Sequence, residues 1–481
     1  MIKTTLLTAL ASLCVFTAVN AKAKPRPASG PWQQADSIVN AIKKTQFPDR
    51  VYNITDFGAK AAVPQRRLAL AHDAINLAIV TCSQEGGGTV VIPDSTYITG
   101  PITMMSNVNL HLSDGAVLKF STEPNLYFPA VLTRWEGLDC YNTHPLIYAY
   151  GCTNIALTGK GKLDAQATND NWWAMCGAEH YGWSDGKVSQ RNGSRAQLLQ
   201  WGESQTPVYL RQFTANDGMR PQFVNFYRCT QVLIEDVTLE SSPFWVIHPL
   251  FCNDLIVRRV KVNNQGPNGD GCDPESCNRV LIEGCTFNTG DDCIAIKSGR
   301  NMDGRKWNTP SQNIVVRDCH FAAGHGGVVI GSEISGGYRN LYVENCTMDS
   351  PNLDRVIRIK TSSCRGGTIE NIYVRNVEVG QCREAVLRIN LDYEHNEVCR
   401  RGNNPVVRNV NLENVNCKKS RFGIYLIGLE DECNLYDVNV KNCNWSNVEK
   451  GRHNLRGKYR NIRQTDVLLN GENSPAIPDV L

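Results

Sequence analysis

The sequence has no excess of charge of either sign and, after its first residues, no long hydrophobic run. Fifty basic residues face 47 acidic ones, which leaves a formal net charge of +3. This near balance provides no large electrostatic surface for nucleic acid, so no nucleic-acid partner is expected. Aromatic residues make up only 8% of the chain, but hydrophobic residues make up 42%. That content suffices for a large core and excludes both a disordered chain and a disulfide-stabilised miniprotein.

The one long apolar run stands at the N-terminus, from Thr5 to Val19. A basic residue precedes it and small residues close it, as in a secretory signal peptide that is removed by cleavage. The run is short for a membrane span. Leu13 stands before Cys14, where a lipoprotein signal has a small residue, so no membrane anchor is expected. We therefore predict a signal peptide over residues 1–21 and export, either to a periplasm or to the medium.

The sequence also lacks helical patterns between its strands, although short strands are frequent. From about Asn154 onward, each unit holds a polar residue, alternating apolar residues and a small residue after Asn or Asp. Examples are Asn278–Cys285, Asn313–Cys319, Asn340–Cys346, Asn371–Val377 and Asn409–Val415. Units of roughly 20–40 residues that stack on their neighbours indicate a solenoid, and strands this short indicate a β-helix. We predict an all-β fold, a single-stranded parallel β-helix.

Nineteen cysteines in an exported chain first suggest disulfides, but the repeat orders many of them differently. One group precedes the first apolar strand residue by three positions: Cys152, Cys229, Cys252 and Cys277. A second group occupies the strand end: Cys285, Cys319, Cys346 and Cys443. Valine fills this second position in other units, so the slot is interior and these eight cysteines are predicted to be buried free thiols. The preceding Asn345 and Asn376 predict turns with left-handed backbone geometry.

The repeats place the β-helix over residues 49–470, with a linker at 22–48 and a C-terminal tail at 471–481. Apolar residues at helical spacing between Leu68 and Cys82 predict a short helix that caps the open end of the solenoid. An insertion at about residues 164–219 breaks the repeat and contains four tryptophans. It forms either a loop with its own small core or an aromatic wall beside a carbohydrate cleft.

Acidic residues and a histidine recur at one place in consecutive units. Three segments superpose when the units are aligned: Gly269–Cys272, Gly290–Cys293 and Gly324–Gly327. This alignment places Asp270, Asp291 and His325 in one column, with about 4.8 Å between neighbouring coils. Arg358 and Lys360 point outward beside that column in the following unit.

Asp292 adds a third carboxylate, although its inward parity requires a turn or bulge for it to reach the surface. Three carboxylates this close cannot all ionise easily, so one retains a proton at neutral pH while the others act as bases. Glycosidic hydrolysis requires this division, with an acid for the leaving oxygen and a base for water. A single surface aspartate is usually only solvated, but several on successive coils favour a functional site.

Four segments, in this order along the chain, resemble the signature motifs of glycoside hydrolase family 28, the polygalacturonases: Asn268–Asp270, Gly290–Asp292, Gly324–Gly326 and Arg358–Lys360. The resemblance extends from about Val51 to Val448. It implies a right-handed parallel β-helix of the pectin-lyase type. It also implies hydrolysis of α-1,4-linked galacturonic acid with inversion, without metal or cofactor, and pectin, an acidic polysaccharide, as the partner.

The resemblance assigns catalytic roles residue by residue. It implies that Asp291 is the general acid and that Asp270 and Asp292 activate the attacking water. His325 is similar to the histidine that assists the acid or holds the substrate. The first motif departs from the commonest form, because Gly269 stands where threonine is usual.

Substrate binding falls to a second group of residues. Arg358 and Lys360 resemble the pair that binds the sugar carboxylate, which suits their fixed positive charge. Tyr393 matches the substrate-contacting tyrosine of the family, and Asn268 of the first motif is a further candidate contact. Lys297, which points outward in the column of Lys360, is either another contact or a solvated strand lysine.

The segment Ser298–Pro310 lengthens the interval between the second and third motifs. Together with Pro243–Pro249, it is similar to bacterial exo-acting members of the family. A longer loop can block one end of the groove, so release of single terminal galacturonic acid units is expected. Homogalacturonan and galacturonic acid on rhamnogalacturonan both fit as substrates, and the sequence does not indicate an oligomeric state.

Two other functions share the predicted fold. A non-catalytic β-helix that binds polysaccharide explains the repeats but not the column of acidic residues and histidine. A pectate lyase needs calcium and a basic proton abstractor. Four carboxylates are candidate calcium ligands for such a lyase: Asp270, Asp273, Asp291 and Asp292. Unsaturated products or chelator sensitivity would identify the lyase, and an inactive Asp291→Asn variant would exclude the simple binder.

Overall fold

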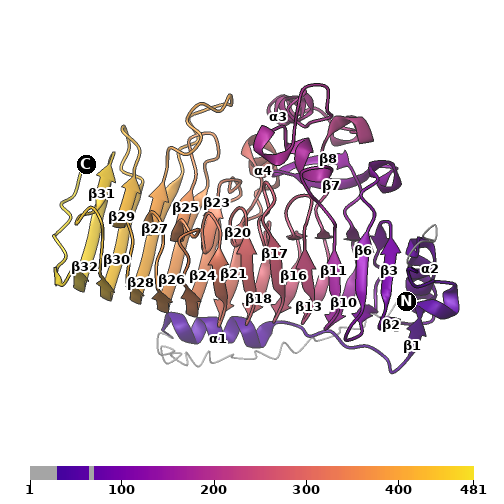
Figure 1. Ribbon diagram of the computed structural model, residues 1–481. Helices are drawn as coiled ribbons and strands as arrows, with labels where there is room; N and C mark the ends of the chain where they lie inside the picture. Colours follow the sequence, from indigo (N-terminus) through magenta and orange to yellow (C-terminus); the bar gives the residue numbers. More distant parts are fainter. Residues whose placement is uncertain (1–29, 64–69) are drawn as a thin grey trace, which may run out of the picture.

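The computed structural model describes residues 30–63 and 70–481. The predicted signal peptide, residues 1–21, lies outside these described residues. From Val51 onward the chain winds into successive coils whose strands stack in parallel along one axis (Figure 1). The predicted parallel β-helix is confirmed, and the first and last coils lie at opposite ends of it.

The largest sheet has 21 strands, nearly all of them parallel to their neighbours. They are β1 (Val51–Asn53), β2 (Gly88–Ile92), β3 (Thr96–Thr99), β5 (Val108–Leu112), β6 (Val117–Phe120), β10 (Thr153–Gly159), β11 (Lys162–Asp164), β13 (Thr230–Glu235), β14 (Thr238–Glu240), β16 (Asn253–Arg258), β17 (Lys261–Asn264), β18 (Asn278–Glu283), β19 (Thr286–Thr289), β21 (Ser311–Arg317), β22 (His320–Ala323), β24 (Tyr338–Met348), β26 (Thr368–Val379), β28 (Val406–Cys417), β30 (Leu435–Trp445), β32 (Arg460–Leu469) and β33 (Glu472–Asn473).

Two shorter parallel sheets form another side of the coils. The first contains β4 (Ile102–Thr103), β9 (Ile147–Tyr150), β12 (Val224–Tyr227) and β15 (Ile247–Leu250). The second contains β20 (Ile294–Ile296), β23 (Val328–Gly331), β25 (Arg355–Lys360), β27 (Ala385–Asn390), β29 (Phe422–Ile427) and β31 (Asn454–Arg456). Single bridges from Ile247 to Cys272 and from Cys272 to Ile294 join the two sheets. A separate antiparallel hairpin consists of β7 (Val131–Trp135) and β8 (Leu138–Asn142).

Helices are few and lie outside the coils. The α-helices are α1 (Pro31–Ala41), α2 (His72–Gln84), α3 (Ser194–Glu203) and α4 (Asn301–Trp307). The short 3₁₀ helices are η1 (Ile54–Phe57), η2 (Pro124–Tyr127), η3 (Trp172–Cys176), η4 (Glu179–Tyr181), η5 (Val208–Leu210) and η6 (Ala215–Asp217). Helix α2 covers the N-terminal end of the solenoid, as predicted, and buries Ala74, Ile75 and Ile79 against it. It thereby shields the core of the first coil from water.

The repeat pattern produces a continuous core inside the coils. Successive strands place Val280, Ile314, Leu341 and Ile372 in register, and all four are buried. β-Branched and leucine side chains stacked from coil to coil remove a column of apolar surface from water. Local alternation in the sequence therefore determines which side of each strand is interior.

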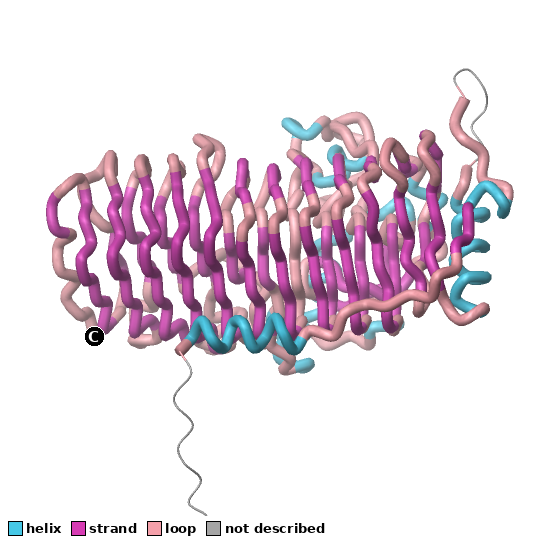
Figure 2. The backbone as a smooth tube through the Cα atoms, turned by 90° about the horizontal axis from the view of Figure 1, so that it is seen from below, coloured by secondary structure: helices cyan, strands magenta, loops and turns pink. Residues whose placement is uncertain are grey.

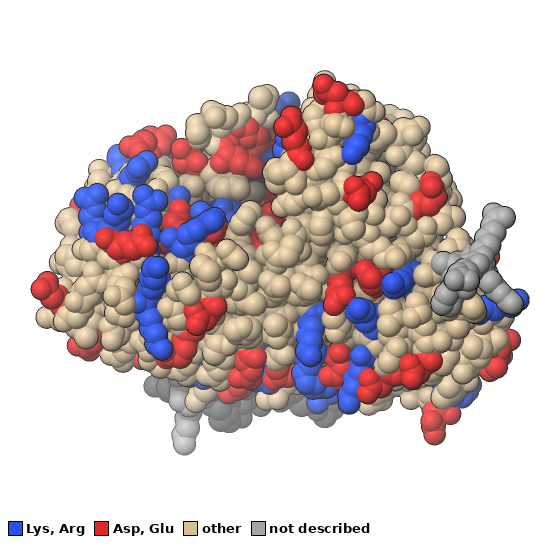
Figure 3. Space-filling model, viewed as in Figure 1, with Lys and Arg blue, Asp and Glu red and all other residues tan. Residues whose placement is uncertain are grey.

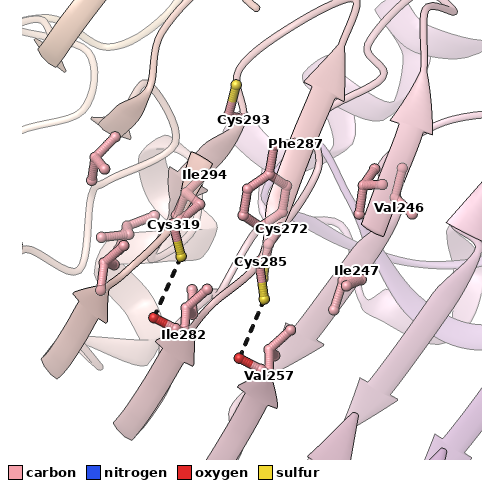
Figure 4. Close-up of a cluster of buried hydrophobic side chains, with 14 of the residues drawn as sticks. Val246, Ile247, Val257, Cys272, Ile282, Cys285, Phe287, Cys293, Ile294 and Cys319 are labelled. Carbon is pink, nitrogen blue, oxygen red and sulfur yellow. Dashed lines mark hydrogen bonds between the residues drawn. The ribbon is translucent and has the colours of Figure 1, made fainter. Parts of the chain in front are cut away.

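The eight cysteines predicted to be free thiols are all unpaired, and seven of them are buried, whereas Cys152 is half-buried. Cys285 and Cys319 donate weak hydrogen bonds to the carbonyls of Val257 and Ile282 of the preceding coil (Figure 4). The asparagine turns also occur as predicted, because Asn345 has a φ of 56°. The described chain contains one disulfide, Cys364–Cys399, which the sequence did not predict.

The segment predicted as a linker, residues 22–48, is helical in part. Helix α1 crosses several strands of the large sheet (Figure 2). Its Ala35 and Ile38 pack on Leu281 and Val315 in a cluster separate from the main core. These outward-facing apolar residues gain burial from the contact, so this part of the segment adheres to the β-helix.

The insertion forms a lobe on the side of the coils opposite α1 (Figure 1). It carries α3 and packs with the β7–β8 hairpin around a small apolar cluster that includes Trp135, Leu198 and Phe213. This cluster corresponds to the first of the two predictions for the insertion, a loop with its own core. Figure 3 shows a recess between this lobe and the C-terminal coils, with acidic and basic side chains along its rim.

Candidate active site

The predicted site residues meet where the regular strands are interrupted. Between the two shorter sheets, the coil at this position pairs only through isolated bridges of Cys272 and Glu275. Asp270 comes before these bridges, Asp291 comes before β20, and His325 comes before β23. The turns at these positions leave room for polar side chains that regular strand pairing would displace.

The pairing of the coils corrects the column expected from the sequence. Cys272 bridges Ile294, so Asp270 lies opposite Asp292 and not opposite Asp291. The His325 N–H donates to the Asp291 carbonyl, which confirms that these two residues are neighbours on adjacent coils. The shared Gly-Asp sequence suggested that Asp270 aligns with Asp291. The register is set instead by the apolar residues that follow. The three carboxylates nevertheless converge, with one oxygen from each lying within 4.8 Å of the others.

Asp292 is fully buried and anchored by cations. Its Oδ1 accepts a hydrogen bond from Arg358 Nη1 at 3.1 Å, and its Oδ2 accepts one from Lys360 Nζ at 2.7 Å. Burial alone would raise the pKa of Asp292, but the Lys360 and Arg358 charges outweigh burial and hold this pKa well below the ordinary value. Asp292 is therefore ionised at neutral pH.

Asp270 has the opposite environment. Its side chain is buried, and the nearest cationic partner, Lys297 Nζ, lies 3.9 Å from its Oδ2. Burial and the neighbouring Asp291 charge raise the pKa of Asp270 well above the ordinary value. Asp273 lies behind it with both carboxylate oxygens buried and without a hydrogen-bond partner among the described residues, and burial likewise raises its pKa. The carboxyl expected from the sequence to keep its proton at neutral pH is thus Asp270.

His325 and Asp291 form the third part of the site. His325 Nδ1 lies 3.0 Å from Asp291 Oδ1, and the imidazole side chain is 48% exposed. The hydrogen bond to Asp291 raises the pKa of His325. Burial would raise the pKa of Asp291, but the hydrogen bond from His325 and the charges of His325 and Lys360 together outweigh burial and lower this pKa. The pair therefore holds its shared proton on the imidazole side.

The predicted binding residues gather next to these carboxylates. The guanidinium of Arg358 and the ammonium of Lys360 lie 5.6 and 5.4 Å from the centre of the Tyr393 ring. Lys297 is buried beside Glu333, and its Nζ lies 4.8 Å from the centre of the Trp245 ring. Asn268 accepts a hydrogen bond from the buried Arg220 at 2.7 Å. Lys297 is thus not a solvated strand lysine.

Two connected cavities flank the cluster. The smaller, of about 250 Å³, is lined by Asp270, Lys297, Arg358, Lys360 and Tyr393, among others. The larger, of about 490 Å³, extends under the insertion, where His180, Tyr181 and Arg191 line it. The cavities share five residues: Glu136, Arg195, Asn268, Asp291 and His325. A chain of two or more acidic sugars fits such a site by charge, because several cations border both sides of the carboxylate cluster.

Comparison with known proteins agrees with this geometry. The family model for glycosyl hydrolases family 28 matches residues 211–454, just over half of the chain. A solved structure, the hyperthermoactive exopolygalacturonase from Thermotoga maritima, is 38% identical, with a TM-score of 0.86 over 92% of this chain and 96% of that chain. This chain belongs to glycosyl hydrolase family 28. The same match confirms that the β-helix is right-handed, as the resemblance implies.

More distant relatives of this family 28 chain include proteins from plants and bacteria. A probable polygalacturonase from Vitis vinifera is 26% identical over 352 residues, which are 71% of this chain and 63% of that protein. An exo-poly-alpha-D-galacturonosidase from Dickeya chrysanthemi is 25% identical over 382 residues, 75% of this chain and 60% of that protein. The chain therefore spans slightly under two thirds of the length of both relatives.

Beyond the family 28 motifs, the structure adds charged residues that the sequence analysis did not single out. They line the smaller cavity from elements far apart in the chain: Glu136, Arg195, Arg300, Glu333 and Glu394. The sequence marks only the segments that contain Arg300 and Arg195, the long interval between motifs and the insertion. The others sit in the hairpin and single loops, where no repeat marks them.

The four tryptophans of the insertion do not border either cavity of this family 28 site. Trp172 is buried in the main core, and Trp201 packs on Phe213. Trp173 donates to the carbonyl of Ser242. The tryptophan that does line the smaller cavity is Trp245, from a segment noted for its similarity to exo-acting members.

Proposed function

We propose that this family 28 chain hydrolyses α-1,4-linked galacturonic acid in pectin. The observation that carries the proposal is the contact of Asp292 with Arg358 and Lys360, two cations that line a cavity together with Asp270 and Asp291. The cations bind the carboxylates of an acidic sugar chain, and the clustered carboxyl groups supply the acid and base of glycosidic hydrolysis. The names of the relatives, polygalacturonase and exo-poly-alpha-D-galacturonosidase, support the same substrate class.

In the proposed mechanism, Asp291 protonates the leaving glycosidic oxygen. The proton comes from the His325 side of their hydrogen-bonded pair when substrate covers the site. Water binds between Asp270 and Asp292 and attacks C1 from the opposite face of the sugar. Asp292, held as an anion by Lys360, accepts the proton of this water, and the product is the inverted anomer.

Carboxyl groups separated by this short distance are more typical of retaining hydrolases. A retaining reaction would need one carboxylate as the nucleophile. Asp292 is engaged by two cations and Asp270 retains its own proton, so neither is well suited to attack. We therefore propose inversion, as the family resemblance implies.

We further propose that the enzyme acts from chain ends. Arg300 connects four acidic side chains by ion pairs: Glu136, Glu333, Glu394 and Glu397. This network joins the β7–β8 hairpin, the segment before α4 and the loop after β27 into one wall of the smaller cavity. Because these ion pairs hold the wall closed, a polymer cannot pass through this end of the cavity. Only a terminal sugar therefore enters it.

Product analysis over time tests these proposals together. On polygalacturonate, monomer should be the main early product, and proton NMR should show its β-anomer first. Early mixed oligomers would contradict exo action, and an initial α-anomer would contradict inversion. The same assay on rhamnogalacturonan oligosaccharides with terminal galacturonic acid identifies which of the two substrates is preferred.

Export is also part of the proposal and rests on the signal sequence over residues 1–21. None of the described helices is both long and apolar enough to cross a membrane. N-terminal sequencing of protein recovered outside the cytoplasm should give a chain that begins near Lys22. An intact N-terminus in the cytoplasmic fraction would contradict export.

A further inference from the structure

We propose that Glu136 recognises the end of the substrate chain by accepting a hydrogen bond from a free hydroxyl of the terminal sugar. This inference rests on the proposed hydrolysis of a galacturonic acid chain. Glu136 lies at the tip of the β7–β8 hairpin and lines both cavities beside Asp291. No motif of the sequence analysis includes it.

The backbone holds Glu136 in place above the site. Its φ of 43° is left-handed, a conformation that a glutamate adopts only where its surroundings enforce it. The next residue, Gly137, has a φ of 79° and accepts a 2.9 Å hydrogen bond from the Arg300 N–H. A Cβ at Gly137 would lie 2.7 Å from that nitrogen, so the turn fits closely on the Arg300 backbone.

Two arginines hold one oxygen of the Glu136 carboxylate and leave the other without a protein partner. Oε2 accepts from Arg195 at 2.7 Å and from Arg300 at 3.3 Å. Oε1 has no hydrogen bond to any residue within the described part of the chain. Only 11% of the side chain is exposed, and it lines both cavities, so this free oxygen is available to a ligand there.

The charge of Glu136 limits what that ligand group is. The substrate carries a carboxylate on every sugar, and a glutamate oxygen would repel it. An anionic oxygen instead pairs with an O–H donor, in a short and strong hydrogen bond. Glu136 therefore offers the substrate an acceptor that attracts a hydroxyl and repels the sugar carboxylate. That carboxylate is bound by Arg358 and Lys360 instead.

Every galacturonic acid unit has free hydroxyls at O2 and O3, but only a terminal sugar has one at O4 or O1, where the chain would otherwise continue. In an internal unit, O4 and O1 are both bonded to neighbouring sugars and carry no hydrogen. At a chain end one of them is a free O–H: O4 at the non-reducing end or O1 at the reducing end. A terminal unit thus donates to Glu136, whereas an internal unit would bring an acceptor against an acceptor. Glu136 would then determine specificity chemically, in addition to the steric block.

The test uses trigalacturonate and two deoxy analogues that lack one hydroxyl without added bulk. One analogue lacks O4 at the non-reducing end, and the other lacks O1 at the reducing end. We expect one of them to lose roughly tenfold to a hundredfold in kcat/KM with the wild-type enzyme, as for a lost hydrogen bond to a charged group. Which analogue loses activity identifies the end that is read. Equal kcat/KM for all three substrates would overturn the inference.

Glu136→Gln then connects the preference to this side chain. The amide removes the charge and offers an N–H donor, so the ratio of kcat/KM between the trimer and the disfavoured analogue should fall to within about twofold of unity. Glu397→Gln is the matched control, because Glu397 pairs with Arg300 but lines neither catalytic cavity. An unchanged ratio in Glu136→Gln would overturn the inference. If the wild-type enzyme hydrolyses no trimer at all, the proposed function fails instead.

Discussion

The ammonium of Lys360 donates a 2.7 Å hydrogen bond to Asp292, a residue 68 positions earlier in the sequence. Lys360 comes from β25, two coils beyond the turn that carries Asp292. The carboxylate is fully buried and the side chain of Lys360 is only 8% exposed, so little water screens the pair. This contact connects the proposed base of the reaction to the proposed binding site for the substrate carboxylate.

Lys360→Met should raise the pKa of Asp292, because Lys360 is the strongest of the three cations that lower this pKa. The group contributes stability above its unfolded pKa and loses it as pH falls. We therefore expect the acid limb of the kcat profile to move to higher pH and the protein to lose about 3–5 kcal/mol of stability at neutral pH. A pH series of kcat measures the shift of the acid limb, and urea unfolding measures the loss of stability. Lys441→Met, at an exposed ion pair, is the control and should change neither.

Asp270→Asn should abolish activity but stabilise the fold at neutral and alkaline pH. The pKa of Asp270 is higher in the folded protein than in the unfolded chain, so its contribution to stability is lost as pH rises through the folded value. An amide does not titrate and avoids that loss, which amounts to about 1.4 kcal/mol per unit of raised pKa. Calorimetry from pH 4 to 8 should show the variant gaining on the wild type as pH rises. A constant difference would contradict the raised pKa.

Asp291→Asn should lower kcat by at least about a hundredfold, because the amide cannot protonate the leaving oxygen. Binding of oligogalacturonate, measured by calorimetric titration, should persist. Asp318→Asn is a matched control, since Asp318 occupies an exposed left-handed turn that lines neither catalytic cavity. Full turnover in Asp291→Asn would show that Asp291 is not the general acid, and oligogalacturonate binding without turnover in the wild type would favour the non-catalytic binder.

Chelators should leave the activity unchanged. Three carboxylates lie close enough to share a cation, but two protein cations already bind Asp292. The positive charges of Arg358 and Lys360 beside Asp292 would repel a calcium ion at this cluster. Activity is measured in EDTA, followed by readdition of calcium. Inhibition that calcium reverses, with products containing a carbon–carbon double bond, would instead identify a lyase.

Cys346→Val should cost less than about 1.5 kcal/mol of unfolding free energy, as for a core exchange of similar volume. The stacked partner of Cys346 on the next coil is Val377, and Val415 follows on the coil after that. The same column therefore accepts both side chains. Cys346→Asp is the contrasting variant and should prevent folding or cost several kcal/mol, because it buries an unpaired charge. A large loss in Cys346→Val would show that the thiol has a specific role.

The fold was predictable because its signals are local and repeated. Alternation around Val280 and Val316 marks the interior side of each strand, and an asparagine such as Asn345 marks each turn. The acidic candidate residues and His325 also stand out in the sequence, since they lie at the turns where the repeat breaks. Their pairing was not, because the segment from Asp270 to Asp273 forms no regular strand from which a register can be read.

The sequence by itself determined the stacked coils, the interior cysteine slots and the set of acidic and basic residues beside the turns. Only the tertiary structure decided that Asp270 faces Asp292, that α1 covers outward apolar residues, and that Glu136 meets Arg195 and Arg300 at the cavity wall. The physical reason is distance along the chain. Whether a strand residue is buried depends on the few residues around it. The register and the ion pairs between remote segments depend on how all the coils and the insertion pack together.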